Sequence, residues 1–225
     1  MKQIRYLTIH FDTPLKPFEV PAFRGAIIER AGRENILFHN HIDENYLYGY
    51  PVIQYKVIRN KAAIVCLDYG ADEIHRLFEK KVHSIKIGEE QRTLNIDRLQ
   101  MNQFTMNVWQ KSFDYTIFNW IALSQKNHKE FDSLKNNLER EAFLEKVLIG
   151  NILSMAKGIK WNIESPIQVK IRELVTSKKV THKDARLLAF QVRFSTNVFL
   201  PNHIGLGKAV SFGFGTIYSE KNNNA

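Results

Sequence analysis

Residues 50–67 read YPVIQYKVIRNKAAIVCL, two apolar runs separated by the polar triplet Arg59-Asn60-Lys61. Runs rich in β-branched and aromatic residues on either side of a short polar turn are typical of paired strands. We therefore expect a β-hairpin with strands over 50–58 and 62–67. Cys66 lies inside the second run, so we expect it to be a small buried apolar side chain.

The segments on both sides of this hairpin extend the pattern. Residues 4–11 alternate between apolar and polar side chains, which predicts a strand. Pro21 suits the first turn of a helix and Gly32 suits its C-terminal end. After the hairpin we expect a helix over 71–80, then a second hairpin formed by 84–87 and 93–96. The order β-α-β-β-α-β is the ferredoxin-like plan.

The second half of the chain predicts a similar set of elements. We expect a strand over 113–123, a helix over 127–157, and strands over 167–174, 187–194 and 212–218. The expected fold is therefore α+β, with two tandem ferredoxin-like (RRM-like) domains. We place them at residues 1–110, with the candidate catalytic histidines, and 111–225, with a C-terminal glycine-rich loop.

The glycine-rich loop lies in residues 200–215, which read LPNHIGLGKAVSFGFG. Clustered backbone amides in such a loop can form a concavity that binds an anion. The sequence after Lys208 does not fit a phosphate-binding P-loop, and the loop lies too near the C-terminus for a dinucleotide fold. This leaves two interpretations, a contact with a nucleic-acid backbone or a purely structural loop.

Charge favours the first interpretation. The chain of 225 residues has a net charge of +9 and a pI near 9.5. Its last third, residues 151–225, holds eleven Lys and Arg but only four acidic residues. A basic region beside a phosphate-sized loop is typical of nucleic-acid binding, although a lysine-rich surface would also raise the pI.

The composition also excludes some classes of protein. No apolar run is long enough to span a membrane, and the N-terminus lacks the apolar region of a signal peptide. One cysteine without a partner fits a reducing compartment. We expect a cytoplasmic protein with no membrane partner.

Two histidines, His39 and His41, are the candidate catalytic groups. In an extended chain they would point to the same side. They could chelate a metal with Asp43 or Glu44, lie unused on the surface, or supply an acid and a base to one reaction. RNA cleavage by the neighbouring 2′-hydroxyl needs only such proton transfers and a cation that stabilises the phosphorane. We therefore expect no metal and no cofactor.

Three tyrosines, Tyr46, Tyr48 and Tyr50, alternate along the next segment. On one face of a strand they could stack on bases or bind a phosphate oxygen. They could equally form a half-buried sheet face.

Several segments in order resemble one known family, the CRISPR repeat-processing endoribonucleases of the RAMP superfamily. The similarity is to the compact subtype with two adjoining ferredoxin-like domains. The segments that carry it are 23–27, 39–41, 50–56, 148–158 and, most specifically, 202–215.

The resemblance implies metal-independent cleavage of precursor CRISPR RNA within each repeat, leaving 2′,3′-cyclic phosphate and 5′-hydroxyl ends. It implies catalytic functions for His39 and His41, with Tyr48 assisting, and leaves their division of labour open. It also implies RNA contacts from the C-terminal loop, at Gly205, Gly207, Lys208, Ser211, Gly213 and Gly215. A non-catalytic RNA-binding subunit of a CRISPR effector complex is the alternative, and a homodimer is a further possibility.

Overall fold

The hairpin expected over 50–67 is present as β4 (Ile53–Ile58) and β5 (Lys61–Leu67). The computed structural model describes residues 1–39, 41–42, 45–46, 49–79, 84–182 and 185–220, and of residues 41–42, 45–46 and 182 the backbone alone. Arg59 and Asn60 have φ of 53° and 61°, as a two-residue type I′ turn requires. Both strands are almost wholly buried, because α1 contacts β4 and the C-terminal loop also packs on it.

The first half of the chain has the expected ferredoxin-like topology. Its elements are β1 (Lys2–Pro14), η1 (Pro17–Glu19), α1 (Val20–Ala31), α2 (Ile36–His39), β2 (His41–Ile42), β3 (Asn45–Tyr46), β4, β5, α3 (Gly70–Glu73), η2 (Ile74–Phe78), β6 (Ser84–Ile87), β7 (Glu90–Thr93) and β8 (Ile96–Met106). The main sheet has the order β4-β5-β1-β8 and is antiparallel throughout. Pro21 lies in the first turn of α1, and Gly32, at φ 99°, ends this helix.

The second expected hairpin differs from the prediction. Strand β6 pairs with β7, residues 90–93, and not with a strand over 93–96. The fourth strand of the main sheet is instead β8, which the sequence did not predict. β8 lies at the edge of the sheet, and its Leu99 and Met101 are 53% and 51% exposed. An edge strand that buries little apolar surface gives no clear alternation in the sequence.

The second half repeats the strand arrangement of the first. Its elements are β9 (Val108–Trp120), α4 (Gln125–Ser133), α5 (Asn137–Gly158), β10 (Val169–His182), β11 (Ala185–Val198), η3 (Val210–Phe212) and β12 (Thr216–Ser219). The antiparallel sheet has the order β10-β11-β9-β12. The glycine-rich segment 200–215 takes the place of the second helix of the plan. The strand expected over 212–218 is short because Gly213 and Gly215 have positive φ, 86° and 62°. β8 ends at Met106 and β9 begins at Val108, and the division at 110/111 stays a prediction.

The long helix expected over 127–157 is two helices. Ser124 caps α4, its Oγ accepting a hydrogen bond from the Asn127 N–H at 3.1 Å. Asn136 caps α5 in the same way, with Oδ1 at 2.9 Å from the Glu139 N–H. An asparagine cap begins a new helix because its side chain satisfies an amide of the first turn.

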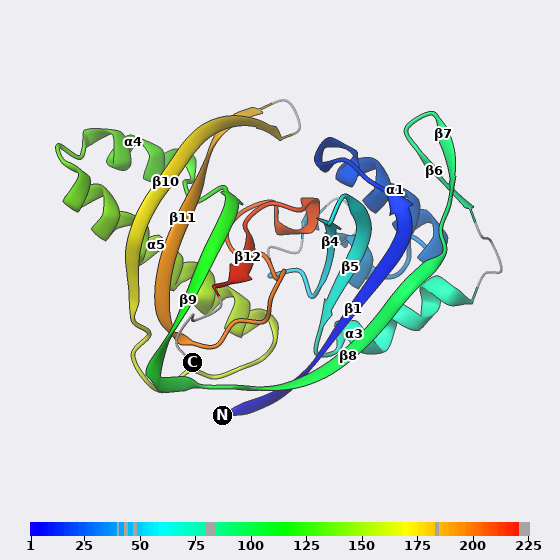
Figure 1. Ribbon diagram of the computed structural model, residues 1–225, viewed down its shortest axis with the longest axis horizontal. Coiled ribbons are helices and arrows are strands. Elements are labelled where there is room, and N and C mark those ends of the chain that lie inside the picture. Colours follow the sequence, from blue (N-terminus) through cyan, green and yellow to red (C-terminus); the bar gives the residue numbers. More distant parts are fainter. Residues whose placement is uncertain (40, 43–44, 47–48, 80–83, 183–184, 221–225) are drawn as a thin grey trace.

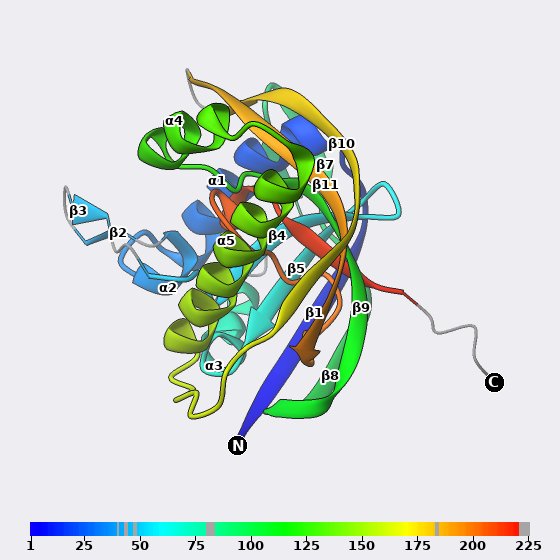
Figure 2. The same ribbon diagram turned by 90° about the vertical axis from the view of Figure 1, so that its left-hand side faces the viewer.

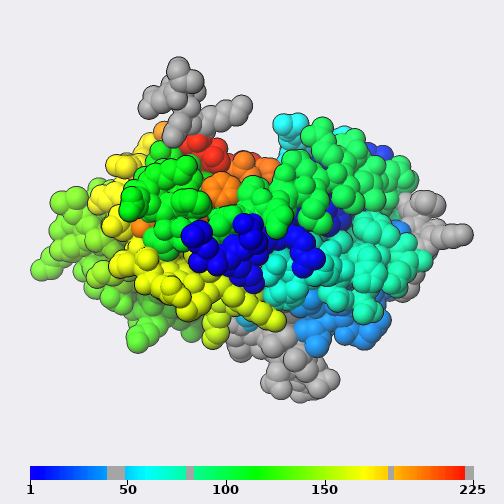
Figure 3. All heavy atoms as spheres, turned by 90° about the horizontal axis from the view of Figure 1, so that it is seen from below, coloured from blue at the N-terminus to red at the C-terminus, as the bar shows by residue number. Residues whose placement is uncertain are grey.

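The two sheets lie side by side, with the glycine-rich segment and β12 between them (Figure 1). Helices α4 and α5 lie beside β10, and α1 and α3 lie beside the first sheet. Viewed from below, the N-terminal residues lie across the boundary between the two halves (Figure 3). There, Lys2 forms an ion pair with Asp68 at 2.7 Å and donates to the Ile159 carbonyl, while Tyr69 donates to the Gly158 carbonyl at 2.9 Å.

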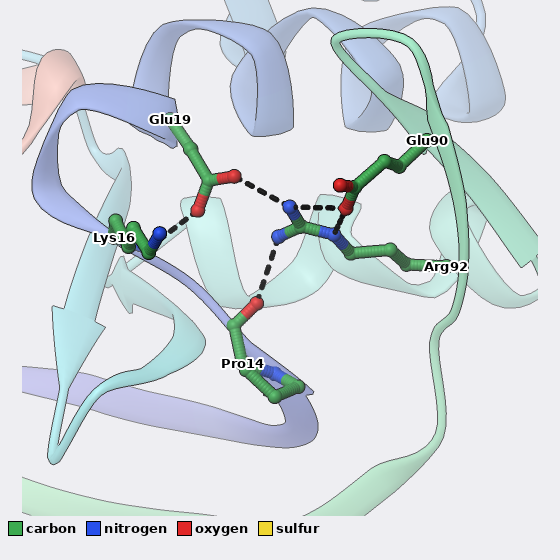
Figure 4. Close-up of polar contacts among 5 residues, drawn as sticks. All are labelled: Pro14, Lys16, Glu19, Glu90 and Arg92. Carbon is green, nitrogen blue, oxygen red and sulfur yellow. Dashed lines mark hydrogen bonds and ion pairs between the residues drawn. The ribbon is translucent and has the colours of Figure 1, made fainter.

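The β6–β7 hairpin is tied to the start of α1 by Arg92 (Figure 4). The Arg92 guanidinium binds the carboxylates of Glu19 and Glu90 and donates to the Pro14 carbonyl oxygen. The other oxygen of Glu19 accepts from the Lys16 N–H at 2.7 Å. These hydrogen bonds hold the pKa of Glu19 below its usual value, Arg92 being the larger cause.

Candidate functional site

The glycine-rich segment joins the two halves of the molecule. Gly205 is buried, its N–H donates to Gln54 Oε1 at 2.9 Å, and its carbonyl accepts from the Tyr50 hydroxyl at 2.8 Å. The Lys56 ammonium group donates to the Thr216 hydroxyl at 3.2 Å. Side chains of β4 and of the segment before it therefore fix the glycine-rich segment and the start of β12 by hydrogen bonds.

Most amides of this segment that were expected to face RNA donate inside the protein. The Lys208 N–H donates to Ile121, the Gly213 N–H to Val210 and the Gly215 N–H to Asn119, each at 3.1 Å. A Cβ at Gly215 would lie 1.9 Å from the Leu206 carbonyl oxygen, and one at Gly207 would lie 2.7 Å from Trp120. The structure thus gives these glycines a packing function, and their contact with RNA stays a prediction.

The Lys208 side chain is exposed and lines a hollow of about 900 Å³, which we call the basic groove. Its other cationic side chains are Lys126, Lys129 and Arg186, from α4 and β11. Among the described residues that line it, none is acidic. Such a groove attracts a polyanion. Ser211 is half-buried in η3 and does not line it.

His39 is the last residue of α2, so the extended chain assumed for residues 39–41 does not apply to it. The short helix is held by two hydrogen bonds to its last carbonyls. The Tyr55 hydroxyl donates to Phe38 at 3.0 Å, and Arg24 Nη2 donates to His39 at 2.7 Å. The Arg24 guanidinium also lies 4.8 Å from the centre of the Phe212 ring. One arginine therefore connects α1, the glycine-rich segment and His39.

The half-buried His39 ring has a defined orientation. Its Nε2 lies 2.6 Å from the carbonyl oxygen of Arg33. A carbonyl oxygen only accepts, so Nε2 carries the proton and, in the neutral ring, Nδ1 carries the lone pair. A histidine in this tautomer can act as a base through Nδ1.

The other candidate catalytic residues lie partly outside the described residues. His41 begins β2 and is paired in register with Tyr46 of β3, and for both only the backbone is described. Tyr48 and Asn40 lie outside the described residues. Tyr50 is buried and hydrogen-bonded to Gly205, and burial raises its pKa, so it has a packing function.

Sequence reasoning missed two residues near the site, Arg24 and Lys56. Lys56 is fully buried, and the cost of desolvating its charge lowers its pKa to about 7. A lysine between two apolar neighbours in a predicted central strand was the signal for it. For Arg24 the sequence gave no comparable signal, because its partners come from the distant segments 36–39 and 210–212.

Two further findings concern membrane-spanning helices and metal-binding clusters in the described part of the chain. Among those residues, no helix combines the length and the apolar character that crossing a bilayer requires. In the same residues, no three His, Cys, Asp or Glu side chains gather as they would around a metal ion. Asp43, Glu44 and the His41 ring were not part of that set.

Comparison with solved structures places this fold among CRISPR-associated proteins. A crystal structure of Cas6b has a TM-score of 0.88 and 27% sequence identity, covering 97% of this chain and 100% of that one. A CRISPR RNA processing endoribonuclease Cas6b has a TM-score of 0.73 and 26% identity with the same coverage.

Sequence comparison defines the family. Residues 2–105 match the Cas6b N-terminal domain and residues 107–220 match the Cas6b C-terminal domain. The chain belongs to the Cas6b family, which confirms the expected resemblance. An uncharacterized protein of Methanocaldococcus jannaschii is 37% identical over 98 residues, which are 44% of this chain and 65% of the relative, less than two thirds of its length.

Proposed function

We propose that this protein is a metal-independent endoribonuclease that cuts precursor CRISPR RNA within its repeats. The ribose 2′-oxygen attacks the adjacent phosphorus, and the bond to the 5′-oxygen of the next nucleotide breaks. The products carry a 2′,3′-cyclic phosphate and a 5′-hydroxyl group. Membership of the Cas6b family supports this proposal, as does the similarity to a protein described as a CRISPR RNA processing endoribonuclease.

The observation that carries the mechanism is the geometry of His39. Because Nε2 donates to the Arg33 carbonyl, Nδ1 is the nitrogen that would accept the 2′-hydroxyl proton. We assign the base function to His39 as part of this proposal. His41, two residues later, would then protonate the leaving 5′-oxygen, with Tyr48 assisting.

The basic groove is suited to hold the RNA backbone that leads to this site. Lys208, Lys126, Lys129 and Arg186 line it, and α4 lies on the same side of the molecule as β2 and β3 (Figure 2). Phosphate contacts of this kind position RNA but carry little sequence information.

The test is an incubation of the purified chain with a transcript of its cognate repeat, followed by mapping of both new ends. We expect cleavage in EDTA and cyclic-phosphate ends. His39→Ala and His41→Ala should each slow cleavage by about 10²–10⁴-fold with little change in RNA affinity. His75→Ala is the matched control, because this exposed ring lies on η2 and is hydrogen-bonded to the Asp72 carbonyl oxygen.

Three outcomes would contradict the proposal. Strict dependence on added metal would exclude the mechanism. Unchanged cleavage in the His39/His41 double variant would show that neither residue is catalytic. Tight RNA binding without any product would favour the non-catalytic subunit.

A further inference from the structure

Three permanent cations gather in a hollow of about 510 Å³, which we call the basic pocket. They are Arg59 of the β4–β5 turn, Lys61 at the start of β5 and Arg98 of β8. Of the described residues in its lining, Asp97 alone is acidic, and its carboxylate lies 3.9 Å from the Lys61 ammonium group. Cationic side chains therefore outnumber carboxylates in this concave surface, which favours an anion.

Two histidines, His10 of β1 and His203, complete the wall of this pocket. Burial, then the neighbouring His10, Lys56 and Arg59, lowers the pKa of His203 to about 4. Burial and the nearby Arg98 and Arg59 lower the pKa of His10, against a smaller opposite effect of Asp97. Burial first and positive surroundings second thus lower the pKa of both rings, and a bound anion would act against the second effect.

An apolar hollow of about 520 Å³, which we call the aromatic pocket, lies next to the basic pocket. The rings of Phe118, Phe212, Phe214 and Tyr218 line it, together with Val57 and a few polar groups. Phe118 is 37% exposed, and its ring lies edge-on to Tyr218 with the centroids 5.3 Å apart. A partly exposed aromatic surface of this kind suits the stacking of a nucleobase.

Tyr218 of β12 belongs to both pockets. Its ring packs nearly perpendicular to Phe118 and to His203, with centroids 5.3 and 5.0 Å apart. An apolar, aromatic pocket and a cationic pocket are therefore separated by the thickness of one side chain. A nucleotide has the same arrangement, a flat base and an anionic phosphate joined by one ribose.

Glu220 also lines the aromatic pocket, and it shares the half-exposed Arg193 with Glu173. Glu220 Oε1 accepts from the Thr116 hydroxyl at 2.6 Å and lies 3.3 Å from Arg193 Nε. Glu220 lines the aromatic pocket and is not part of the lining of the basic pocket, where the phosphate would lie.

We propose that these two pockets bind one nucleotide of a single-stranded RNA, with its base against Phe118 and Tyr218 and its phosphate on Arg59, Lys61 and Arg98. This inference rests on the proposed RNA cleavage. The phosphate position and His39 lie on different sides of the molecule, since β12 and the β4–β5 turn lie on one side and β2 and β3 on the other (Figure 2). The basic pocket therefore anchors a part of the strand away from the bond that is cut. Phe212, in the wall of the aromatic pocket, contacts Arg24 and so connects this pocket to His39.

The test is a binding assay with the full-length protein and a fluorescent single-stranded repeat RNA. Phe118→Ala and Arg98→Ala should each weaken binding by about tenfold, with the single-turnover rate at saturating RNA unchanged. The matched controls are Phe18→Ala, a 75% exposed phenylalanine on η1, and Lys86→Ala, an exposed lysine on β6. Thermal unfolding midpoints should show that all four variants fold.

A scan with single abasic nucleotides identifies the bound unit. At one position the missing base should weaken binding to the unaltered protein by about tenfold and have no further effect on Phe118→Ala. A methylphosphonate at the neighbouring linkage removes the charge of one phosphate. It should weaken binding to the unaltered protein and have no further effect on Arg98→Ala. In histidine-labelled protein, the RNA should raise the pH at which the His203 signals titrate.

The outcomes separate the subsite from the enzyme. If the protein cuts repeat RNA but both variants bind it as the unaltered protein does, the subsite is wrong and the proposed function stands. If the protein neither binds nor cuts repeat RNA, both proposals fail. The protein could instead bind adenosine or uridine monophosphate tightly while the variants leave RNA binding unchanged. That result would show that the ligand of the two pockets is a free nucleotide, and it would overturn the inference.

Discussion

Arg24 donates a hydrogen bond to the backbone carbonyl oxygen of His39, with 2.7 Å between the two atoms. The guanidinium lies 4.8 Å from the centre of the Phe212 ring and 6.0 Å from that of Tyr55, the outer limit of a cation–π contact. The position of His39 is thus linked through a single side chain to the glycine-rich segment, more than 170 residues away along the chain. Substitution of Arg24 should therefore change the cleavage rate and leave RNA affinity nearly unchanged.

The first prediction concerns this link. Arg24→Met should lower the single-turnover cleavage rate by about 10–100-fold, because small displacements of a catalytic group cost up to about 10²-fold. RNA affinity should stay within about twofold, and Arg24→Lys should restore part of the rate. Arg5→Met is the control, since Arg5 pairs with the half-exposed Asp72. An equal loss of affinity and rate would show that Arg24 acts through RNA binding or folding.

The second prediction concerns Lys208, the exposed lysine of the glycine-rich segment. Lys208→Ala should weaken RNA binding and reduce the slope of log K against log salt by about 0.7, the value for one phosphate of a single strand. Cleavage at saturating RNA should be unchanged. Affinity measured between 50 and 300 mM salt, at roughly five concentrations, gives the slope. A slope equal to that of the Lys86→Ala control would show that Lys208 does not contact an RNA phosphate.

The third prediction concerns Lys56, which is fully buried between the two halves. Burial lowers its pKa from 10.5 to about 7, so between these values the unfolded chain binds more protons than the folded one. Stability should therefore rise with pH over this window, and the cost of burying the charge is largest below about pH 7. Lys56→Met should stabilise the protein at pH 6, by up to about 4 kcal/mol.

Denaturant unfolding of both proteins at several pH values measures this difference. It should shrink as the pH rises from 7 toward 10, and Lys61→Met, an exposed lysine on β5, should show no such trend. A difference that is constant across the pH range would mean that the Lys56 ammonium is not desolvated by folding.

The sequence predicted the central strands well because their apolar runs report burial directly. The hairpin of β4 and β5 was found for this reason, and so was the function of Pro21 and Gly32 at the ends of α1. Strand β8 was missed because an edge strand with an exposed Leu99 and Met101 leaves no periodic signal. The break before α5 was missed because Asn136 interrupts an apolar pattern that continues on both sides of it.

The candidate site was predictable in its residue types and not in its contacts. His39 was singled out as one of two histidines after the first predicted helix, and Lys208 as the one positive charge in an apolar glycine-rich loop. The internal hydrogen bonds of Gly205 and Gly215 depend on Gln54 and Asn119, which no local pattern connects to a glycine loop. The same is true of Arg24 and of the two pockets that share Tyr218, because tertiary packing alone brings their walls together.

The last prediction concerns the ion pair between Glu19 and Arg92 (Figure 4). The Glu19 side chain is only 14% exposed, and its hydrogen bonds lower its pKa, so the pair stabilises the fold above the usual pKa of a glutamate. Glu19→Gln should cost about 1–2 kcal/mol at pH 7, and the cost should disappear as the pH falls through the lowered pKa of Glu19. Denaturant unfolding at pH 7 and pH 3 measures this. Glu89→Gln, whose side chain is 96% exposed beside Lys86, should change stability by less than about 0.5 kcal/mol. Equal effects of the two substitutions would show that the hairpin is held by packing and not by this charge.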